Sequence, residues 1–157
     1  MQKFPITQEG FTRLEEECRR LKAVERPVVI EQIATAREHG DLKENAEYHA
    51  AREKQSFIEG RIQELESILG FAEVIDIARL SGTKVKFGAT VVIIDCDTEK
   101  EHIYKIVGEH EASLESGLIS FASPLARGLI GKEEGDEVAV AIPSGKKTYE
   151  ILEVKFK

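Results

Sequence analysis

Two closely spaced carboxylates are the residues of this sequence best suited to chemistry. Asp41 and Glu44 stand three positions apart in the segment HGDLKENAEY, residues 39–48. On a helix this spacing places both groups on one side of one turn. Carboxylate oxygens, with water and phosphate, are the ligands that Mg²⁺ takes in proteins. The same Asp-x-x-Glu pattern is a variant of the capping box that starts a helix, and on pattern alone capping is the commoner explanation.

The pair stands between two amphipathic stretches that must position it. Apolar residues recur every three or four positions in both: Phe11, Leu14, Cys18 and Leu21 in the first, then Ile58, Ile62, Leu65, Leu69 and Ala72 in the second. This spacing predicts an antiparallel two-helix coiled coil. Gly40 predicts the end of the first helix and Asp41 the start of the second. Pro27 should interrupt the first helix, because it lacks a backbone donor and crowds the preceding turn.

The predicted arm is long enough to reach a deep site. Thr7 is the expected N-cap of the first helix. The 32 residues from Gln8 to His39 span about 48 Å at about 1.5 Å per residue. A carboxylate pair at the end of such an arm can be delivered where a globular surface cannot go.

The pattern changes after residue 76. Four stretches rich in β-branched and other apolar residues, joined in pairs by turn residues, predict two β-hairpins, from residues 89–95, 102–107, 137–142 and 148–154. Between the hairpins, Ser123 and Pro124 predict the start of a short helix that Gly131 ends. We therefore expect an α+β protein, with a coiled-coil hairpin over residues 1–76 and a compact, mostly antiparallel sheet domain with a short helix over residues 80–157.

Charge and composition exclude several classes of protein. The net charge is −7; residues 1–76 hold 11 Lys and Arg against 16 Asp and Glu, and the remainder holds 11 against 13. Neither part has the basic excess of a protein that coats nucleic acid, so such contacts must be local. The chain lacks an apolar run of about 18 residues, so no membrane span is expected. With no apolar signal region and two isolated cysteines, Cys18 and Cys96, we expect a cytoplasmic protein. We also expect it to be a monomer.

Two strings of the sequence closely resemble the bacterial Gre transcript-cleavage factors. They are residues 40–53, GDLKENAEYHAARE, and residues 119–133, ISFASPLARGLIGKE, and the likeness runs nearly from end to end. The resemblance implies that the hairpin enters the secondary channel of a backtracked RNA polymerase. It also implies a C-terminal domain similar to the FK506-binding-protein fold, which docks at the channel rim.

The resemblance further implies a role for each site residue. Asp41 and Glu44 stabilise the second Mg²⁺ of the polymerase, and they hold it only together with polymerase carboxylates, so the free protein binds none. The chain is then a cofactor for RNA cleavage by the polymerase and not an enzyme. The nascent RNA 3′ end contacts Arg37 and Arg52, with Asn45 and Tyr48 positioning it. The rim contact involves Ser123, Pro124 and Arg127.

Alternatives remain open at this point. Tyr48 is as well explained by packing across the hairpin as by stacking on a base, and helix capping alone accounts for Ser123 and Pro124. For the whole chain, the rivals are a channel-binding inhibitor without cleavage activity, a prolyl isomerase or chaperone, and a plain coiled-coil adaptor. Intact Asp41 and Glu44 favour cleavage over the first and last of these.

Overall fold

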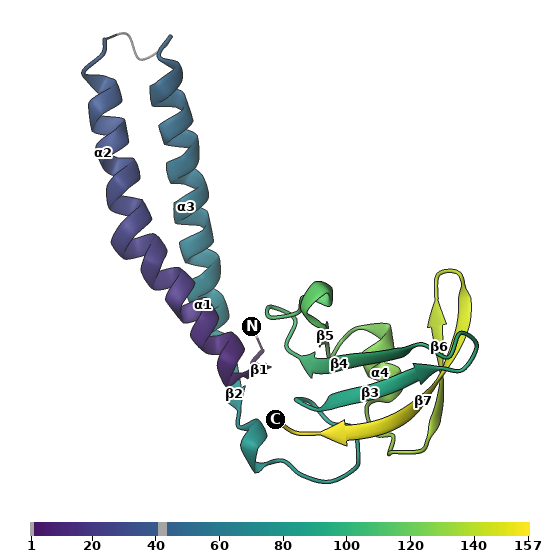
Figure 1. Ribbon diagram of the computed structural model, residues 1–157. Coiled ribbons are helices and arrows are strands. Elements are labelled where there is room, and N and C mark those ends of the chain that lie inside the picture. The colour runs from purple at the N-terminus through teal and green to yellow at the C-terminus, as the bar shows by residue number, and fades with distance from the viewer. Residues whose placement is uncertain (1, 41–43) are drawn as a thin grey trace. The chain divides into compact units, whose positions relative to one another are not determined.

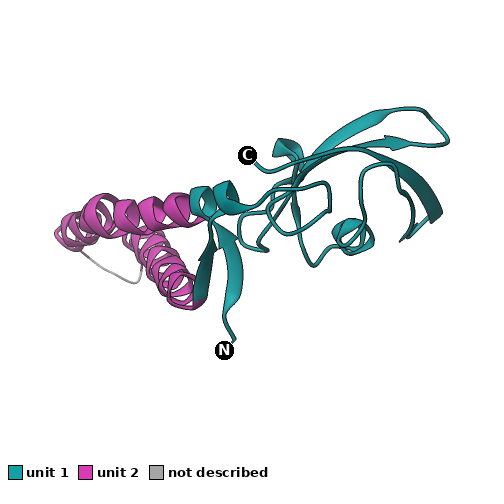
Figure 2. Ribbon diagram, turned by 90° about the horizontal axis from the view of Figure 1, so that it is seen from below, with its two compact units in different colours: residues 1–10, 72–157 teal, residues 11–71 magenta. Residues whose placement is uncertain are grey.

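A computed structural model describes residues 2–40 and 44–157 (Figure 1). The chain forms two compact units (Figure 2). One unit is the helical hairpin Phe11–Phe71, and the other joins Met1–Gly10 to Ala72–Lys157. This division differs from the predicted domains 1–76 and 80–157, because residues on both sides of the hairpin pair as strands beside the C-terminal sheet.

The hairpin consists of two antiparallel helical arms (Figure 1). The first arm comprises α1 (Gln8–Arg20), a π-helical turn η1 (Leu21–Glu25) and α2 (Arg26–Arg37). The second arm is α3 (Ala46–Phe71). No helix among residues 2–40 and 44–157 is long and apolar enough to cross a membrane.

The π turn adjusts the buried stripe of the first arm. The stripe consists of Leu14, Cys18, Leu21, Val29, Ile33 and Ala36. Its spacing of three and four is broken by a step of eight between Leu21 and Val29, one more than a heptad. The backbone N–H of Arg26 donates to the carbonyl of Leu21, five residues back, so the turn absorbs the additional residue. The interruption predicted at Pro27 thus lies in the turn directly before it, and Val28 and Ile30 remain about half exposed.

The second arm confirms most of the predicted stripe. Its buried residues are Ala51, Ile58, Ile62, Leu65 and Ile68. Leu69 is only half-buried, and Ala72 lies in a strand instead of the helix. Two bidentate ion pairs join the arms: Arg61 binds Glu17 (2.7 and 2.9 Å) and Arg26 binds Glu59 (2.8 and 2.7 Å).

A two-stranded parallel sheet, which the sequence did not predict, lies at the base of the hairpin helices. It pairs β1 (Phe4–Thr7) with β2 (Ala72–Ile75). Thr7 is the N-cap of α1 as predicted, since its hydroxyl accepts a hydrogen bond from Gly10 N–H (3.1 Å).

The larger sheet has five strands in the order β5-β4-β3-β7-β6. These strands are β3 (Thr90–Asp95), β4 (Glu101–Val107), β5 (Leu118–Ser120), β6 (Glu137–Ile142) and β7 (Gly145–Lys155). Every pairing is antiparallel except β4 with β5. The helix α4 (Pro124–Leu129) contributes Ala126 and Leu129 to one apolar core with the sheet. Short 3₁₀ turns, η2 (Ile77–Arg79) and η3 (Leu114–Ser116), complete the unit.

The predicted α+β class, the helical hairpin, both β-hairpins and the short helix are therefore confirmed. The likeness of the sheet unit to the FK506-binding-protein fold stays a prediction.

Candidate metal and nucleic-acid site at the hairpin tip

The tip is bounded by a glycine stop and an asparagine cap. Gly40 has φ +106°, in the left-handed region that favours glycine, which confirms it as the stop after α2. The predicted start of the second helix at Asp41 is wrong, because α3 begins at Ala46. The Tyr48 N–H donates to Asn45 Oδ1 (3.0 Å), so Asn45 is the N-cap. Asp41 itself lies outside the described residues.

Asn45 also ties the two arms together. Its side-chain amide donates to the carbonyl of Ala36 (2.7 Å), in the last turn of α2. One side chain therefore satisfies a free donor at the start of α3 and adds a second hydrogen bond to a carbonyl in the last turn of α2, which also accepts from His39 N–H (3.1 Å). The resemblance predicted an RNA-positioning role for Asn45, and the sequence reasoning missed this structural one. An asparagine directly before a helical pattern was the available signal.

Glu44 stands directly before the cap, and its side chain is exposed. Its carboxylate makes no hydrogen bond or ion pair with another described residue. Asn45 already supplies the cap, so the capping explanation is wrong for Glu44. It borders a shallow hollow of about 460 Å³, which is lined by His39, Glu44, Asn45, Ala46 and Glu47. Free carboxylate oxygens beside such a hollow are suited to a hard cation such as Mg²⁺.

The tip as described cannot enclose a metal ion by itself. Among residues 2–40 and 44–157, no group of three His, Cys, Asp or Glu side chains is placed to bind one. A cation bound at Glu44 therefore needs further ligands from Asp41, from water or from another molecule.

Three of the four residues predicted to contact RNA form one cluster behind the tip. The guanidinium carbons of Arg37 and Arg52 lie 5.9 and 6.0 Å from the centre of the Tyr48 ring. Arg52 also donates to the Tyr48 hydroxyl (3.4 Å). A hydrogen bond from Arg37, aided by the charges of both arginines, lowers the pKa of Tyr48. Since Arg37 belongs to α2 and Arg52 to α3, Tyr48 packs across the hairpin, as the structural alternative predicted.

This cluster can offer positive charge to a polyanion. No carboxylate among the described residues forms an ion pair with either arginine. The two also flank a hollow of about 280 Å³, together with Ile30, Ile33, Ala34 and Gln55. An arginine cluster of this kind suits a few phosphates of a single strand, and a neighbouring tyrosine suits a base.

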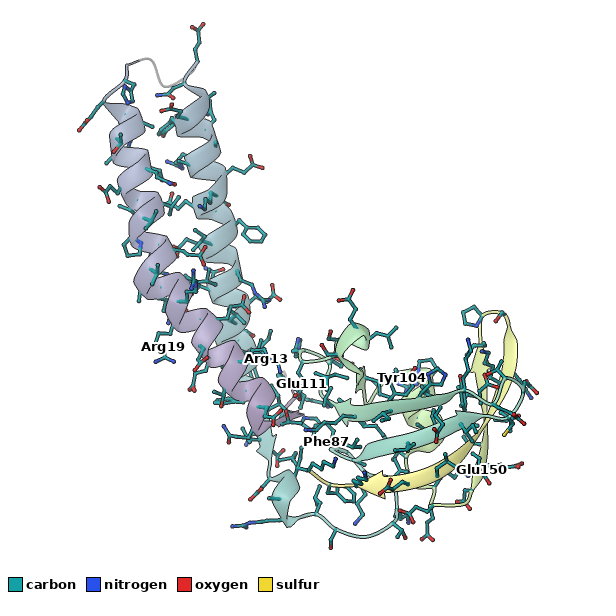
Figure 3. The ribbon with its side chains drawn as sticks, viewed as in Figure 1. Arg13, Arg19, Phe87, Tyr104, Glu111 and Glu150 are labelled. Atoms are coloured by element: carbon teal, nitrogen blue, oxygen red, sulfur yellow. The ribbon has the colours of Figure 1, made fainter. Side chains whose placement is uncertain are left out.

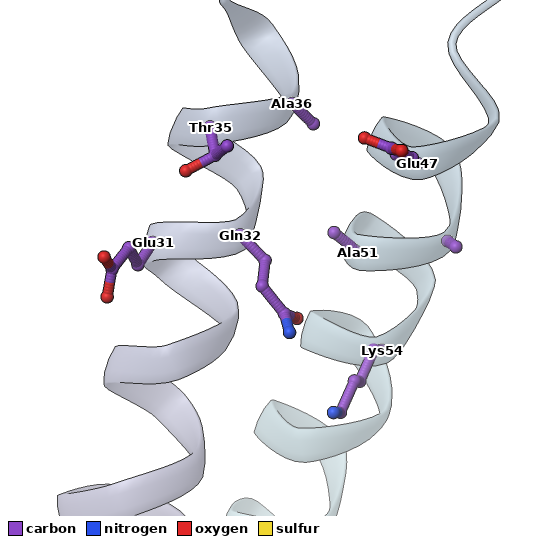
Figure 4. A pocket seen from close by; sticks show the side chains of 8 residues that line it. Glu31, Gln32, Thr35, Ala36, Glu47, Ala51 and Lys54 are labelled. Atoms are coloured by element: carbon purple, nitrogen blue, oxygen red, sulfur yellow. The ribbon is translucent and has the colours of Figure 1, made fainter.

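Another groove lies between α2 and α3, where small alanines line the gap (Figure 4). Its volume is about 520 Å³, and its lining includes Ala36, Ala51, Glu31, Glu47 and Lys54. It contains none of the predicted site residues.

The predicted docking residues lie in the sheet unit, at α4. Ser123 Oγ accepts a hydrogen bond from Ala126 N–H (3.3 Å), and Pro124 occupies the first turn, which confirms the predicted cap. Pro124 and Arg127 are exposed, so they remain free for an intermolecular contact.

Comparison with known proteins agrees with these features. Residues 4–74 match the family described as "Transcription elongation factor, N-terminal", and residues 80–156 match "Transcription elongation factor, GreA/GreB, C-term". The chain therefore belongs to the GreA/GreB family of transcription elongation factors.

Individual relatives refine this assignment. The chain is 64% identical to transcription elongation factor GreA of Cereibacter sphaeroides strain ATCC 17029 and 61% identical to GreA of Paracoccus denitrificans, over 99% of each chain. Within the family it is most like GreA. Among solved structures, the chain aligns with the crystal structure of GreA factor homolog 1 (Gfh1) of Thermus thermophilus, with a TM-score of 0.45 and 25% identity over 98% of this chain and 99% of that chain.

Family membership confirms the predicted class of function. The chain is a transcription elongation factor, its implied partner is RNA polymerase, and the names of its relatives indicate no enzymatic activity of its own. Neither a prolyl isomerase nor a channel-binding inhibitor is favoured by these matches.

Proposed function

We propose that this factor stimulates the RNA polymerase to cleave its own backtracked transcript. The hairpin would enter the secondary channel, and Glu44 with Asp41 would complete the ligand set of the second, weakly held Mg²⁺. The observation that carries the proposal is the exposed carboxylate of Glu44 at the end of the hairpin, which no helix cap occupies.

The chemistry of the donor set supports this role. Phosphodiester hydrolysis by two metal ions uses a pair about 3.5–4 Å apart, which stabilises the attacking and leaving oxygens. Mg²⁺ is commonly bound through one or two protein carboxylates plus phosphates and water. Glu44 and Asp41 therefore suffice as this chain's share, and the polymerase would supply the rest.

The arginine cluster supports a contact with the displaced RNA. Arg37 and Arg52 would bind phosphates of the nascent 3′ end, and Asn45 would act mainly by holding the tip closed. Tyr48 could offer one ring face to a base, a contact of about 1–3 kcal/mol in proteins that bind single strands. Ser123, Pro124 and Arg127 would contact the channel rim. We propose that the factor acts as a monomer in the cytoplasm, with the polymerase.

Cleavage of an end-labelled transcript in backtracked complexes tests the proposal. The wild-type factor should accelerate release of the 3′ fragment, whereas Glu44→Gln and Asp41→Asn should abolish acceleration while still competing with the wild type for polymerase. Glu53→Gln is the matched control, because it removes an exposed carboxylate of α3 that does not border the tip hollow. Full acceleration by Glu44→Gln, or loss of polymerase binding by both tip variants, would contradict the proposal.

A further inference from the structure

A buried carboxylate in the sheet unit holds the first turn of α1. Glu111 is 6% exposed, and Figure 3 shows it at the base of this helix. Its Oε2 accepts hydrogen bonds from Thr7 N–H (2.8 Å) and Gly108 N–H (2.9 Å), and its Oε1 accepts one from the Thr7 hydroxyl. No described Lys, Arg or His forms an ion pair with it. A buried carboxyl group that only hydrogen bonds from described residues satisfy is unusual enough to need an explanation.

The hydrogen bonds continue directly into the helix. The Thr7 hydroxyl that donates to Glu111 also accepts from Gly10 N–H (3.1 Å) and so caps α1. The chain of contacts therefore runs from residues 108–111, which follow β4, through Thr7 to the helix start.

Two glycines beside Glu111 leave room for its carboxyl group, and a larger residue at either position would not fit. A Cβ atom on Gly10 would overlap the Glu111 carboxylate, and one on Gly108 would overlap the carbonyl of Pro5. The Phe4 and His110 rings also meet, with centres 5.0 Å apart. Strand β1 is thus attached on one side to β2 and on the other to residues 108–111.

We propose that Glu111 is a positioning residue: its hydrogen bonds to Thr7 restrict the range of orientations that the helical hairpin can take relative to the sheet unit. The reason is that α1 is one helix from Gln8 to Arg20, and Glu111 fixes the first turn of this helix. The consequence for RNA cleavage rests on the proposed function: a restricted arm brings Glu44 to the polymerase site in a larger fraction of bound complexes.

A distance measurement on the free protein tests the restriction without polymerase. Spin labels are placed on the exposed native Cys96 and on Ser56→Cys in α3, while Cys18 stays buried. Glu111→Gln replaces one of the two acceptor oxygens by an amide donor, so at least one of the three hydrogen bonds from Thr7 and Gly108 is lost or reversed. The distribution of distances between the labels should therefore broaden. Thr7→Val should also broaden it, whereas Thr7→Ser, which keeps the hydroxyl, should match the wild type. Glu115→Gln, an exposed neighbour, is the control.

An unchanged distribution in a folded Glu111→Gln protein would overturn the proposal. If that variant fails to fold, Thr7→Val and Thr7→Ser provide the test instead. Distance distributions of equal width in these two variants would also overturn the proposal.

Cleavage then separates positioning from simple stabilisation. At saturating factor, Glu111→Gln should lower the stimulated rate, by up to about 100-fold if the tip is misplaced by about 1 Å. The concentration for half-maximal effect should stay unchanged, since the docking residues are intact. An unaltered saturating rate would overturn the role in cleavage. Absence of cleavage with the wild type would instead refute the proposed function and leave the distance result standing.

Discussion

Replacement of Asn45 separates the two bonds that close the hairpin tip. Asn45→Asp keeps an oxygen that can cap α3 but loses the amide that donates to Ala36, and Asn45→Ala loses both. An N-cap contributes about 1 kcal/mol. A hydrogen bond of this kind adds about 1 kcal/mol more. We therefore expect the first turn of α3 to open about 1 kcal/mol more easily in Asn45→Asp and about 2 kcal/mol more easily in Asn45→Ala.

Amide hydrogen exchange measures these openings residue by residue. The His49 N–H, which bonds to the carbonyl of Asn45, reports on the first turn of α3. Its exchange should accelerate about fivefold in Asn45→Asp and about 30-fold in Asn45→Ala, since about 1.4 kcal/mol corresponds to a factor of ten. Glu53→Gln, an exposed change on the same helix, is the control. Equal exchange in all four proteins would refute the reasoning that Asn45 closes the tip.

Two predictions concern ionisable groups on the hairpin. A hydrogen bond from Arg61 lowers the pKa of Glu17 in the folded protein. The pair therefore stabilises the folded hairpin at pH values above the unfolded-state pKa of about 4.3. This stabilisation is lost as the pH falls through the lower folded-state pKa. Thermal unfolding followed by helical circular dichroism should show a smaller loss of stability between pH 7 and pH 3 in Glu17→Gln than in the wild type; parallel losses would contradict this. Arg37 and Arg52 lower the pKa of Tyr48, so its phenolate should form below the ordinary value of about 10. In ultraviolet titration Arg37→Gln should move this step to higher pH, and no movement would show that Arg37 does not act on the phenol.

The spacing of apolar residues predicted which segments are helices more accurately than it predicted where each helix begins or ends. The stripe of Leu14, Cys18 and Leu21, the Gly40 stop and the Ser123 cap depend on local rules and were all visible in the sequence. The start of α3 was misplaced because Asp41 and Asn45 are both good caps, and only the bond from Asn45 to Ala36, across the hairpin, decides between them.

The features that were missed depend on contacts distant in sequence. The pairing of β1 with β2 joins Phe4 to Ala72, and Glu111 meets Thr7 across 104 positions. No local pattern encodes either contact. The interval of eight residues from Leu21 to Val29 was visible in the sequence. Only the structure shows that a π-helical turn accommodates the additional residue and keeps both side chains buried.

The Mg²⁺ dependence of stimulated cleavage tests the central claim most directly. When bound, the ion would polarise the scissile phosphate and lower the pKa of the attacking water. If Glu44 supplies one of its ligands, the wild-type factor should shift half-maximal cleavage to lower Mg²⁺ concentration than the polymerase requires alone. Glu44→Gln should abolish that shift, and Glu53→Gln, which removes an exposed carboxylate away from the tip hollow, should preserve it. An identical Mg²⁺ requirement with wild-type factor and with Glu44→Gln would contradict the assignment of Glu44 as a metal ligand.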